Sequence, residues 1–144
     1  MKSFFFSFLL LGLTVQVFSQ DKDTTINSKA EVANGPQISW ENPSHNFGDI
    51  IQGDKVEHVF KFTNTGNEPL IITDVQVTCG CTTPKGWLRD PIMPGQSGEI
   101  VIAFNSTGKM GAQTKISTVI SNAVNPDGAK IKFEANVINK KSDN

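Results

Sequence analysis

The fold of this chain is predicted most clearly by the stretch Val56-Glu57-His58-Val59-Phe60-Lys61-Phe62-Thr63. Apolar or aromatic side chains fall at every second position, with Val56, His58, Phe60 and Phe62 on one face. A period of two is typical of a β-strand with one face on a core and the other in water, whereas a helix repeats every 3.6 residues. The stretch therefore predicts a half-buried strand.

Three further stretches alternate in the same way. Their apolar faces, which we expect to point inward, consist of Ile100, Ile102 and Phe104, of Ile116, Thr118 and Ile120, and of Ile131, Phe133, Ala135 and Val137. Residues 70–77 are more evenly apolar, which is typical of a strand covered on both faces. Weaker strands are expected at residues 38–40 and around residues 47–50, where Phe47 lies.

Turn-forming residues separate these strands. Gly, Pro and Asn are concentrated at residues 64–69, 93–98 and 125–128, and the last of these reads as a type I turn. No window shows a helical stripe, and the spacing of turns is that of a sandwich. The sequence thus predicts an all-β fold, a β-sandwich of about seven antiparallel strands.

The N-terminus has the pattern of a secretory signal peptide. Lys2 supplies a positive start, and an apolar run extends from Phe4 to Val17. Val17 and Ser19 suit the −3 and −1 positions of a cleavage site, which places the cut before Gln20. The run is shorter than the roughly 20 residues of a membrane span, so no span is expected after cleavage. No cysteine lies near the cut, which excludes a bacterial lipoprotein anchor.

These features predict an exported chain with four parts: a signal peptide at 1–19, a flexible leader at 20–36, one domain at 37–139 and a polar tail at 140–144. The 144 residues suit one domain, with 38% hydrophobic and 19% charged residues. The 13 basic and 14 acidic residues nearly balance, so no nucleic-acid partner is expected. We expect a periplasmic, cell-surface or secreted location, where cysteines meet an oxidising environment.

Cys79-Gly80-Cys81-Thr82 is the most conspicuous local motif. Gly80 permits a sharp turn, and cysteines two residues apart can meet the spacing of roughly 4.4–6.8 Å between Cα atoms that a disulfide needs. So short a loop would add little stability. The sequence favours a structural turn and leaves open two other roles, thiol–disulfide exchange and binding of a soft metal such as copper.

The remaining metal-ligating residues are His45 and His58. With Cys79 and Cys81 they are the weak candidates for a metal site, but no usual ligand spacing is present, and we predict no metal and no cofactor. Each histidine is expected to be structural. Catalytic motifs such as Gly-x-Ser-x-Gly and phosphate-binding loops are absent from the sequence, so no catalytic residue is assigned and the chain is predicted not to be an enzyme.

Trp87 is the candidate binding residue, in a stretch, residues 84–90, that reads as a loop. An aromatic side chain on a loop at the end of a sandwich either anchors a ligand or folds back over the core. The sequence does not decide between these two roles.

Several short motifs occur in an order that resembles a known family. They are Phe47-Gly48-Asp49-Ile50, Phe62-Thr63-Asn64-Thr65-Gly66, Pro69-Leu70, Cys79-Gly80-Cys81-Thr82, Pro94-Gly95 and Ser121-Asn122. Residues 45–138 resemble the bacterial immunoglobulin-like family of unknown function marked by Cys-Gly-Cys-Thr. The resemblance implies an immunoglobulin-like sandwich, similar in architecture to major-sperm-protein, pilus-chaperone and axonemal domains, and an exported protein of Gram-negative bacteria.

The leading functional hypothesis is an exported, non-catalytic module that binds another envelope or extracellular protein. Binding is expected at an exposed sheet edge or at the loop with Trp87. The first alternative is a small redox or copper-handling protein that uses Cys79 and Cys81. The second alternative is carbohydrate binding through Trp87.

Overall fold

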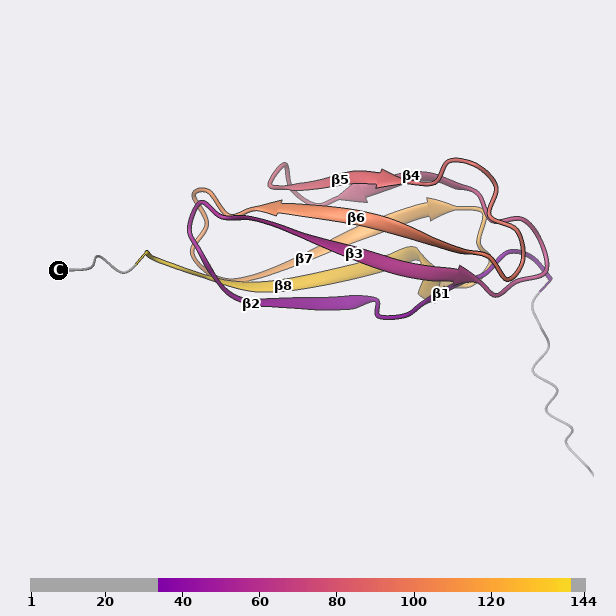
Figure 1. Cartoon of the computed structure of the whole chain (residues 1–144), viewed down its shortest axis with the longest axis horizontal. Helices are drawn as coiled ribbons and strands as arrows, with labels where there is room; N and C mark the ends of the chain where they lie inside the picture. The colour runs from indigo at the N-terminus through magenta and orange to yellow at the C-terminus, as the bar shows by residue number, and fades with distance from the viewer. Residues whose placement is uncertain (1–33, 141–144) are drawn as a thin grey trace, which may run out of the picture. The chain divides into compact units, whose positions relative to one another are not determined.

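A computed structural model describes residues 34–140 of the chain (Figure 1). The predicted signal peptide, most of the leader and residues 141–144 of the predicted tail lie outside these residues. The described part forms strands β1 (Ile38–Trp40), β2 (Ser44–Ile51), β3 (Lys55–Asn64), β4 (Ile72–Val77), β5 (Thr82–Trp87), β6 (Ser97–Asn105), β7 (Gly111–Ser121) and β8 (Lys130–Ile138), with a 3-10 helix, η1 (Pro126–Ala129), before β8.

The strands form two sheets of four. One has the order β1-β3-β6-β5 and the other β2-β8-β7-β4, and the two layers face each other in Figure 1. The predicted all-β sandwich is confirmed. The described residues form eight strands, against about seven predicted. One detail was wrong: β2 runs parallel to β8, so the strands are not all antiparallel.

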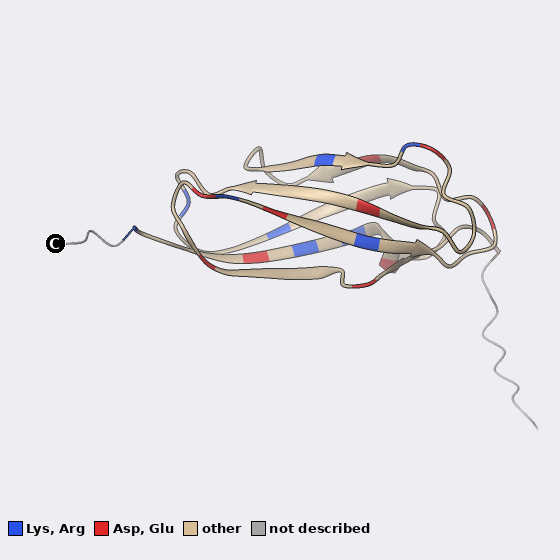
Figure 2. Cartoon of the chain, in the orientation of Figure 1, with Lys and Arg blue, Asp and Glu red and all other residues tan. Residues whose placement is uncertain are grey.

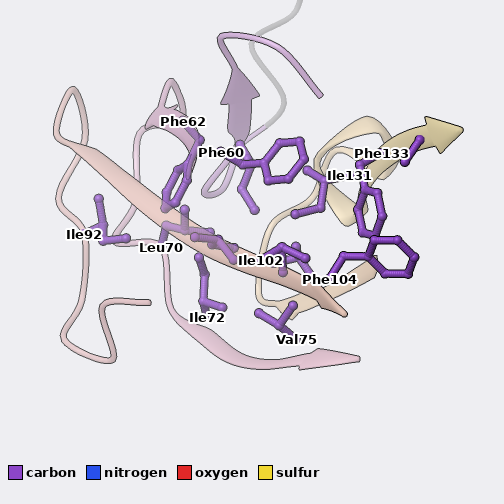
Figure 3. Packing of buried hydrophobic residues seen from close by; sticks show 14 of the residues in the cluster. Phe60, Phe62, Leu70, Ile72, Val75, Ile92, Ile102, Phe104, Ile131 and Phe133 are labelled. Carbon is purple, nitrogen blue, oxygen red and sulfur yellow. The ribbon is translucent and has the colours of Figure 1, made fainter. Parts of the chain in front are cut away.

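The core lies between the two sheets (Figure 3). Four phenylalanines that were predicted to face inward are at most 2% exposed, namely Phe60, Phe62, Phe104 and Phe133. Phe47 packs at the margin of this cluster from β2, a longer strand than the sequence suggested. Burial of such apolar surface, at roughly 25 cal/mol per Å², supplies most of the driving force for folding.

The predicted inward face of β7 was wrong. Ile116 and Ile120 are 40% and 37% exposed, whereas Ser117 and Val119 are buried. The register with β8 explains this result, because Ser117 lies opposite Ile131, whose side chain points into the core. Directly opposed residues of paired strands share a face, so pairing with β8 places the other set of β7 side chains inward.

Two further predictions were wrong along β4 and β5. The segment at residues 70–77 is not covered on both faces, since Thr73 and Gln76 of β4 are exposed and Ile71 just before it is 39% exposed. The stretch read as a loop at residues 84–90 begins within strand β5, which pairs with β6. Pro84 and Gly86 obscured this strand, and the pairing shifts by a residue between them.

Among residues 34–140, no helix has the length and apolar character that crossing a bilayer would require.

Candidate functional site

Cys79 and Cys81 lie in the turn that carries the chain from β4 in one sheet to β5 in the other. Their sulfurs form a disulfide, and their Cα atoms are 5.3 Å apart. The backbone N–H of Thr82 donates to the carbonyl of Cys79 (3.2 Å), which closes the turn. Gly80 is exposed and makes the turn without a positive φ. The sequence left open whether Cys79 and Cys81 are oxidised, and the structure shows them joined as a disulfide.

A groove of about 290 Å³ lies beside this turn on the outer face of the sheet β1-β3-β6-β5. Its lining includes Cys81, Lys55, Glu57, Lys85, Ala103 and Phe104. Lys85 of β5 and Glu57 of β3 form an ion pair across β6, in which Ala103 is the residue opposite Glu57. A small side chain at that position leaves room beneath the ion pair.

The groove could not be predicted from the sequence. Its charged residues come from β3 and β5, which are not neighbours in the sheet, and the sequence of residues 84–90 is typical of a loop. The alternation of β3 does place Lys55 and Glu57 on the outer face, and this feature of the sequence could have indicated the charged part of the groove.

His45 and His58 are brought together from opposite sheets. The two rings stack with centroids 3.6 Å apart and planes 9° from parallel. His45 also meets Phe47 edge to face, and His58 meets Phe60 in the same way. Burial and, second, the charge of His45 lower the pKa of His58 below its usual value of 6.5.

The four weak metal candidates thus form two separate pairs. The cysteines are joined to each other, and the histidines stack instead of converging on one point. Within the part of the chain that the structure describes, no three His, Cys, Asp or Glu side chains gather in a group that could hold a metal ion.

Trp87 folds back over the core. Its half-buried ring packs against the core cluster, and the indole N–H donates to the carbonyl of Ile72 in β4 (3.3 Å). The guanidinium carbon of Arg89 lies 4.7 Å from the ring centroid. Of the two roles left open by the sequence, this packing is the one that the geometry supports.

Comparison with protein families gives one match. The family described as Protein of unknown function (DUF1573) covers residues 38–137, which is most of the described sandwich. No curated protein matches the chain.

The solved structures that share the fold include the following three. A protein of unknown function from Porphyromonas gingivalis W83 is 21% identical with a TM-score of 0.61, covering 76% of this chain and 51% of its own. The PapD-like domain 7 of human CEP192 is 11% identical with a TM-score of 0.54, covering 73% of this chain and 87% of its own. The YadV chaperone is 16% identical with a TM-score of 0.51, covering 74% of this chain and 55% of its own.

These likenesses establish the fold and not a function, and this chain spans about half the length of the Porphyromonas gingivalis protein. They confirm the predicted immunoglobulin-like sandwich and the coarser part of the resemblance, an immunoglobulin-like domain of unknown function. The matched family is not a known enzyme family. That Cys-Gly-Cys-Thr marks the family stays a prediction.

Proposed function

Since this chain belongs to the family described as Protein of unknown function (DUF1573), we propose its function from its fold and surface: it is an exported, non-catalytic module that binds an extended segment of another envelope or extracellular protein. The observation that carries the proposal is the free edge of β3. An exposed edge of a sheet can accept a further strand, with the main-chain hydrogen bonds supplying affinity.

One side of β3 is fully paired, and the other is not. On one side β6 pairs with β3 along its whole length. On the other side β1 pairs only with residues 62–64, and Lys61 O accepts from the N–H of Glu41 (3.0 Å). No strand of the described residues pairs with the first half of β3 on this second side.

The hydrogen-bond pattern shows which backbone groups this edge presents. Asn64 N donates toward the β6 side, to Gln96 O (2.9 Å), so the even-numbered residues of β3 face β6. Because backbone direction alternates along an antiparallel strand, the N–H and C=O groups of Glu57 and Val59 point to the open edge. An added strand would find four unpaired main-chain groups there.

The other sheet edges are less regular. In β4, the carbonyl of Ile72 accepts from the Trp87 indole and the N–H of Val75 donates to the Asp74 carboxylate (2.8 Å). In β5, Pro84 lacks a donor and adjoins a bulge. In β2, the pairing with β8 is interrupted by a bulge at residues 46–49. The first half of β3 is therefore the edge best suited to strand addition.

The surface around this edge carries charges of both signs. Lys55, Glu57 and Lys61 lie along the outer face of β3 (Figure 2). The charged residues of β6 and β8 are Glu99 in β6 and Lys130, Lys132 and Glu134 in β8. Such a surface offers specific pairing to a partner segment of mixed charge rather than a field of one sign.

A pair of substitutions at Val59 tests the edge. Val59→Pro removes the N–H that faces the edge, whereas Val59→Thr keeps it along with β-branching. The mature proteins are immobilised and challenged with an envelope extract of the native host, and bound proteins are identified by mass spectrometry. We expect the wild type and Val59→Thr to recover the same partner and Val59→Pro to lose it, with circular dichroism confirming that all three are folded.

Amide hydrogen exchange provides a readout that needs no substitution. Binding of the recovered partner should slow exchange at Glu57 and Val59, since their N–H groups become paired. Undiminished binding by Val59→Pro, together with unchanged exchange at the two amides, would show that the edge is not used. Failure to recover any specific partner would overturn the binding function itself.

Export is the second part of the proposal and rests on the N-terminal pattern of Lys2 and the apolar run that ends at Val17. Intact mass of the protein from the host envelope should correspond to a chain that begins at Gln20. A mass that includes residues 1–19, or recovery in the cytoplasmic fraction alone, would contradict export.

A further inference from the structure

The turn between β4 and β5 is held by main-chain hydrogen bonds as well as by its disulfide. It is closed by the hydrogen bond from Thr82 N to Cys79 O (3.2 Å), and Cys81 O accepts from Asn105 N (2.9 Å) beside β6. A disulfide that spans two residues removes very little entropy from the unfolded chain, so it adds little stability. The sulfur bond can therefore open while the sandwich stays folded.

The two sulfurs lie in different surroundings. Cys79 Sγ is 3.5 Å from the hydroxyl oxygen of Thr82, a residue that is 3% exposed. Cys81 is packed against the core cluster. A hydroxyl can donate to a thiolate and stabilise it, whereas apolar surroundings raise the pKa of a thiol. If the disulfide opens, the negative charge is therefore better placed on Cys79 than on Cys81.

Cys81 is also the cysteine that can be reached from the groove. Cys81 lines the groove on the outer face of the sheet, where Lys85 is paired with Glu57 and Lys55 leaves a net positive charge. An incoming thiolate is an anion, and nearby ammonium groups favour its approach. The groove thus leads to the cysteine whose attack releases the better-stabilised leaving group.

We propose that the Cys79–Cys81 disulfide exchanges with the thiol of a partner protein that enters this groove and attacks Cys81. The partner thiolate forms a new bond to Cys81 Sγ as the Cys79–Cys81 bond breaks, and the electron pair of that bond leaves on Cys79 Sγ. The products are a mixed disulfide at Cys81 and a Cys79 thiolate that accepts a hydrogen bond from Thr82. A second thiolate of the partner can then displace Cys81, which leaves the partner oxidised and both cysteines reduced.

This activity goes beyond the proposed binding function and does not require it. The exchange site lies on the outer face and the strand-addition site lies at the β3 edge, so each can fail alone. A Val59→Pro protein that loses its partner should still exchange thiols.

Glutathione serves as the probe thiol in a test on the purified, oxidised mature protein. The reaction is quenched with acid, free thiols are blocked with N-ethylmaleimide, and tandem mass spectrometry locates both groups. We expect glutathione on Cys81 and maleimide on Cys79, with at least about a tenfold preference over the reverse arrangement. No mixed disulfide, equal labelling of the two cysteines, or preference for Cys79 would each overturn the proposal.

Thr82→Val tests the hydroxyl, with Thr82→Ser as the matched control that retains it. We expect Thr82→Val to slow mixed-disulfide formation about fivefold or more and Thr82→Ser to leave it near the wild-type rate. In a Cys81→Ser background, Thr82→Val should also raise the pKa of the Cys79 thiol, measured from thiolate absorbance. Equal rates and an equal pKa in the two Thr82 variants would contradict the assigned role.

A double variant separates chemistry from folding. Cys79→Ser combined with Cys81→Ser should still unfold cooperatively in urea, with a midpoint close to that of the wild type, because the loop that the disulfide closes is so short. A large fall in the urea midpoint would show that the disulfide holds the turn, and would overturn the inference that it opens in the folded protein.

Discussion

His45 of β2 and His58 of β3 stack face to face with their ring centroids 3.6 Å apart, and so join the two sheets at one margin of the sandwich. Phe47 and Phe60 meet this pair edge to face. The rings pack well only while at most one of them is charged, because two imidazolium ions at this distance repel each other.

The His pair makes stability depend on pH. The pKa of folded His58 is lowered by burial and by His45, whereas the unfolded residue titrates near 6.5. Above that pH, His58 is neutral in both the folded and the unfolded protein. As the pH falls below it, the unfolded chain binds the proton first, so stability is lost until the folded pKa is passed. The urea midpoint should therefore be lower at pH 5.5 than at pH 7.5.

Two aromatic substitutions identify the group responsible. His58→Phe should make the urea midpoint nearly independent of pH between 7.5 and 5.5, since it removes the titrating ring. His45→Phe should reduce it, because only burial then acts on His58. An unchanged pH dependence in both variants would assign the effect to other residues.

Asn64 is a polar residue that is fully buried in the core, with 0% of its surface exposed, so its side chain needs hydrogen-bond partners there. Its side-chain NH2 donates to Glu68 O (2.8 Å) and Ile92 O (2.9 Å), and its oxygen accepts from Gly66 N (3.0 Å). Asn64→Ala should lower the free energy of unfolding by about 3 kcal/mol or more, because buried partners are left unsatisfied. Urea unfolding measures this loss.

Asn64→Asp is the near-isosteric control. It keeps the acceptor but loses both donors and buries a charge, so it should cost at least as much as Asn64→Ala. A loss below about 1 kcal/mol in either variant would contradict the role assigned to the side chain.

Alternation alone was sufficient to predict much of the fold. In β3 and β8 one face is apolar and the other mostly polar, and in β6 the bulkiest apolar side chains fall on one face, so the inward positions of Phe62, Phe104 and Phe133 followed directly. In β7 both faces carry apolar or small residues, and pairing with β8 selects Val119 instead of Ile120. Pairing partners are distant in sequence, so the pattern of one strand cannot reveal them.

Of the candidate sites, too, one part could be predicted from the sequence and another could not. The turn at Cys79 and Cys81 was recognisable because both residues are adjacent in sequence. The stacking of His45 on His58 was not, since it depends on how the two sheets face each other. Several motifs that carried the family resemblance proved structural, as Asn64 illustrates through its hydrogen bonds.

Gly66 is required by close backbone packing. A Cβ there would overlap the carbonyl oxygen of Gly35 and lie 2.6 Å from the nitrogen of Gln37. Gly66→Ala should therefore cost more than about 3 kcal/mol, since backbone atoms cannot move aside cheaply. Gly80→Ala is the matched control, because nothing lies within 4 Å of its added Cβ, and it should change stability by about 0.5 kcal/mol or less. Similar losses in the two variants, measured by urea unfolding, would contradict this assignment.

Trp87 covers the core at the margin of the sandwich where β4 and β5 lie. The size of its contribution to the free energy of unfolding distinguishes a packing role from ligand binding. Its indole N–H donates to Ile72 O and its ring packs against the core cluster. Trp87→Phe should cost about 1 kcal/mol, because the ring stays and the hydrogen bond is lost. Trp87→Ala should cost about 3 kcal/mol through lost apolar contact. Urea unfolding followed by circular dichroism measures both losses.

Arg89→Ala provides the control for Trp87, because Arg89 covers the ring from the exposed side. We expect it to change stability by about 0.5 kcal/mol, since a cation–π contact at an exposed site is weak. If Trp87→Ala instead leaves the urea midpoint unchanged while a glycan array shows binding by the wild type alone, the ring serves as a sugar platform rather than as a cover for the core.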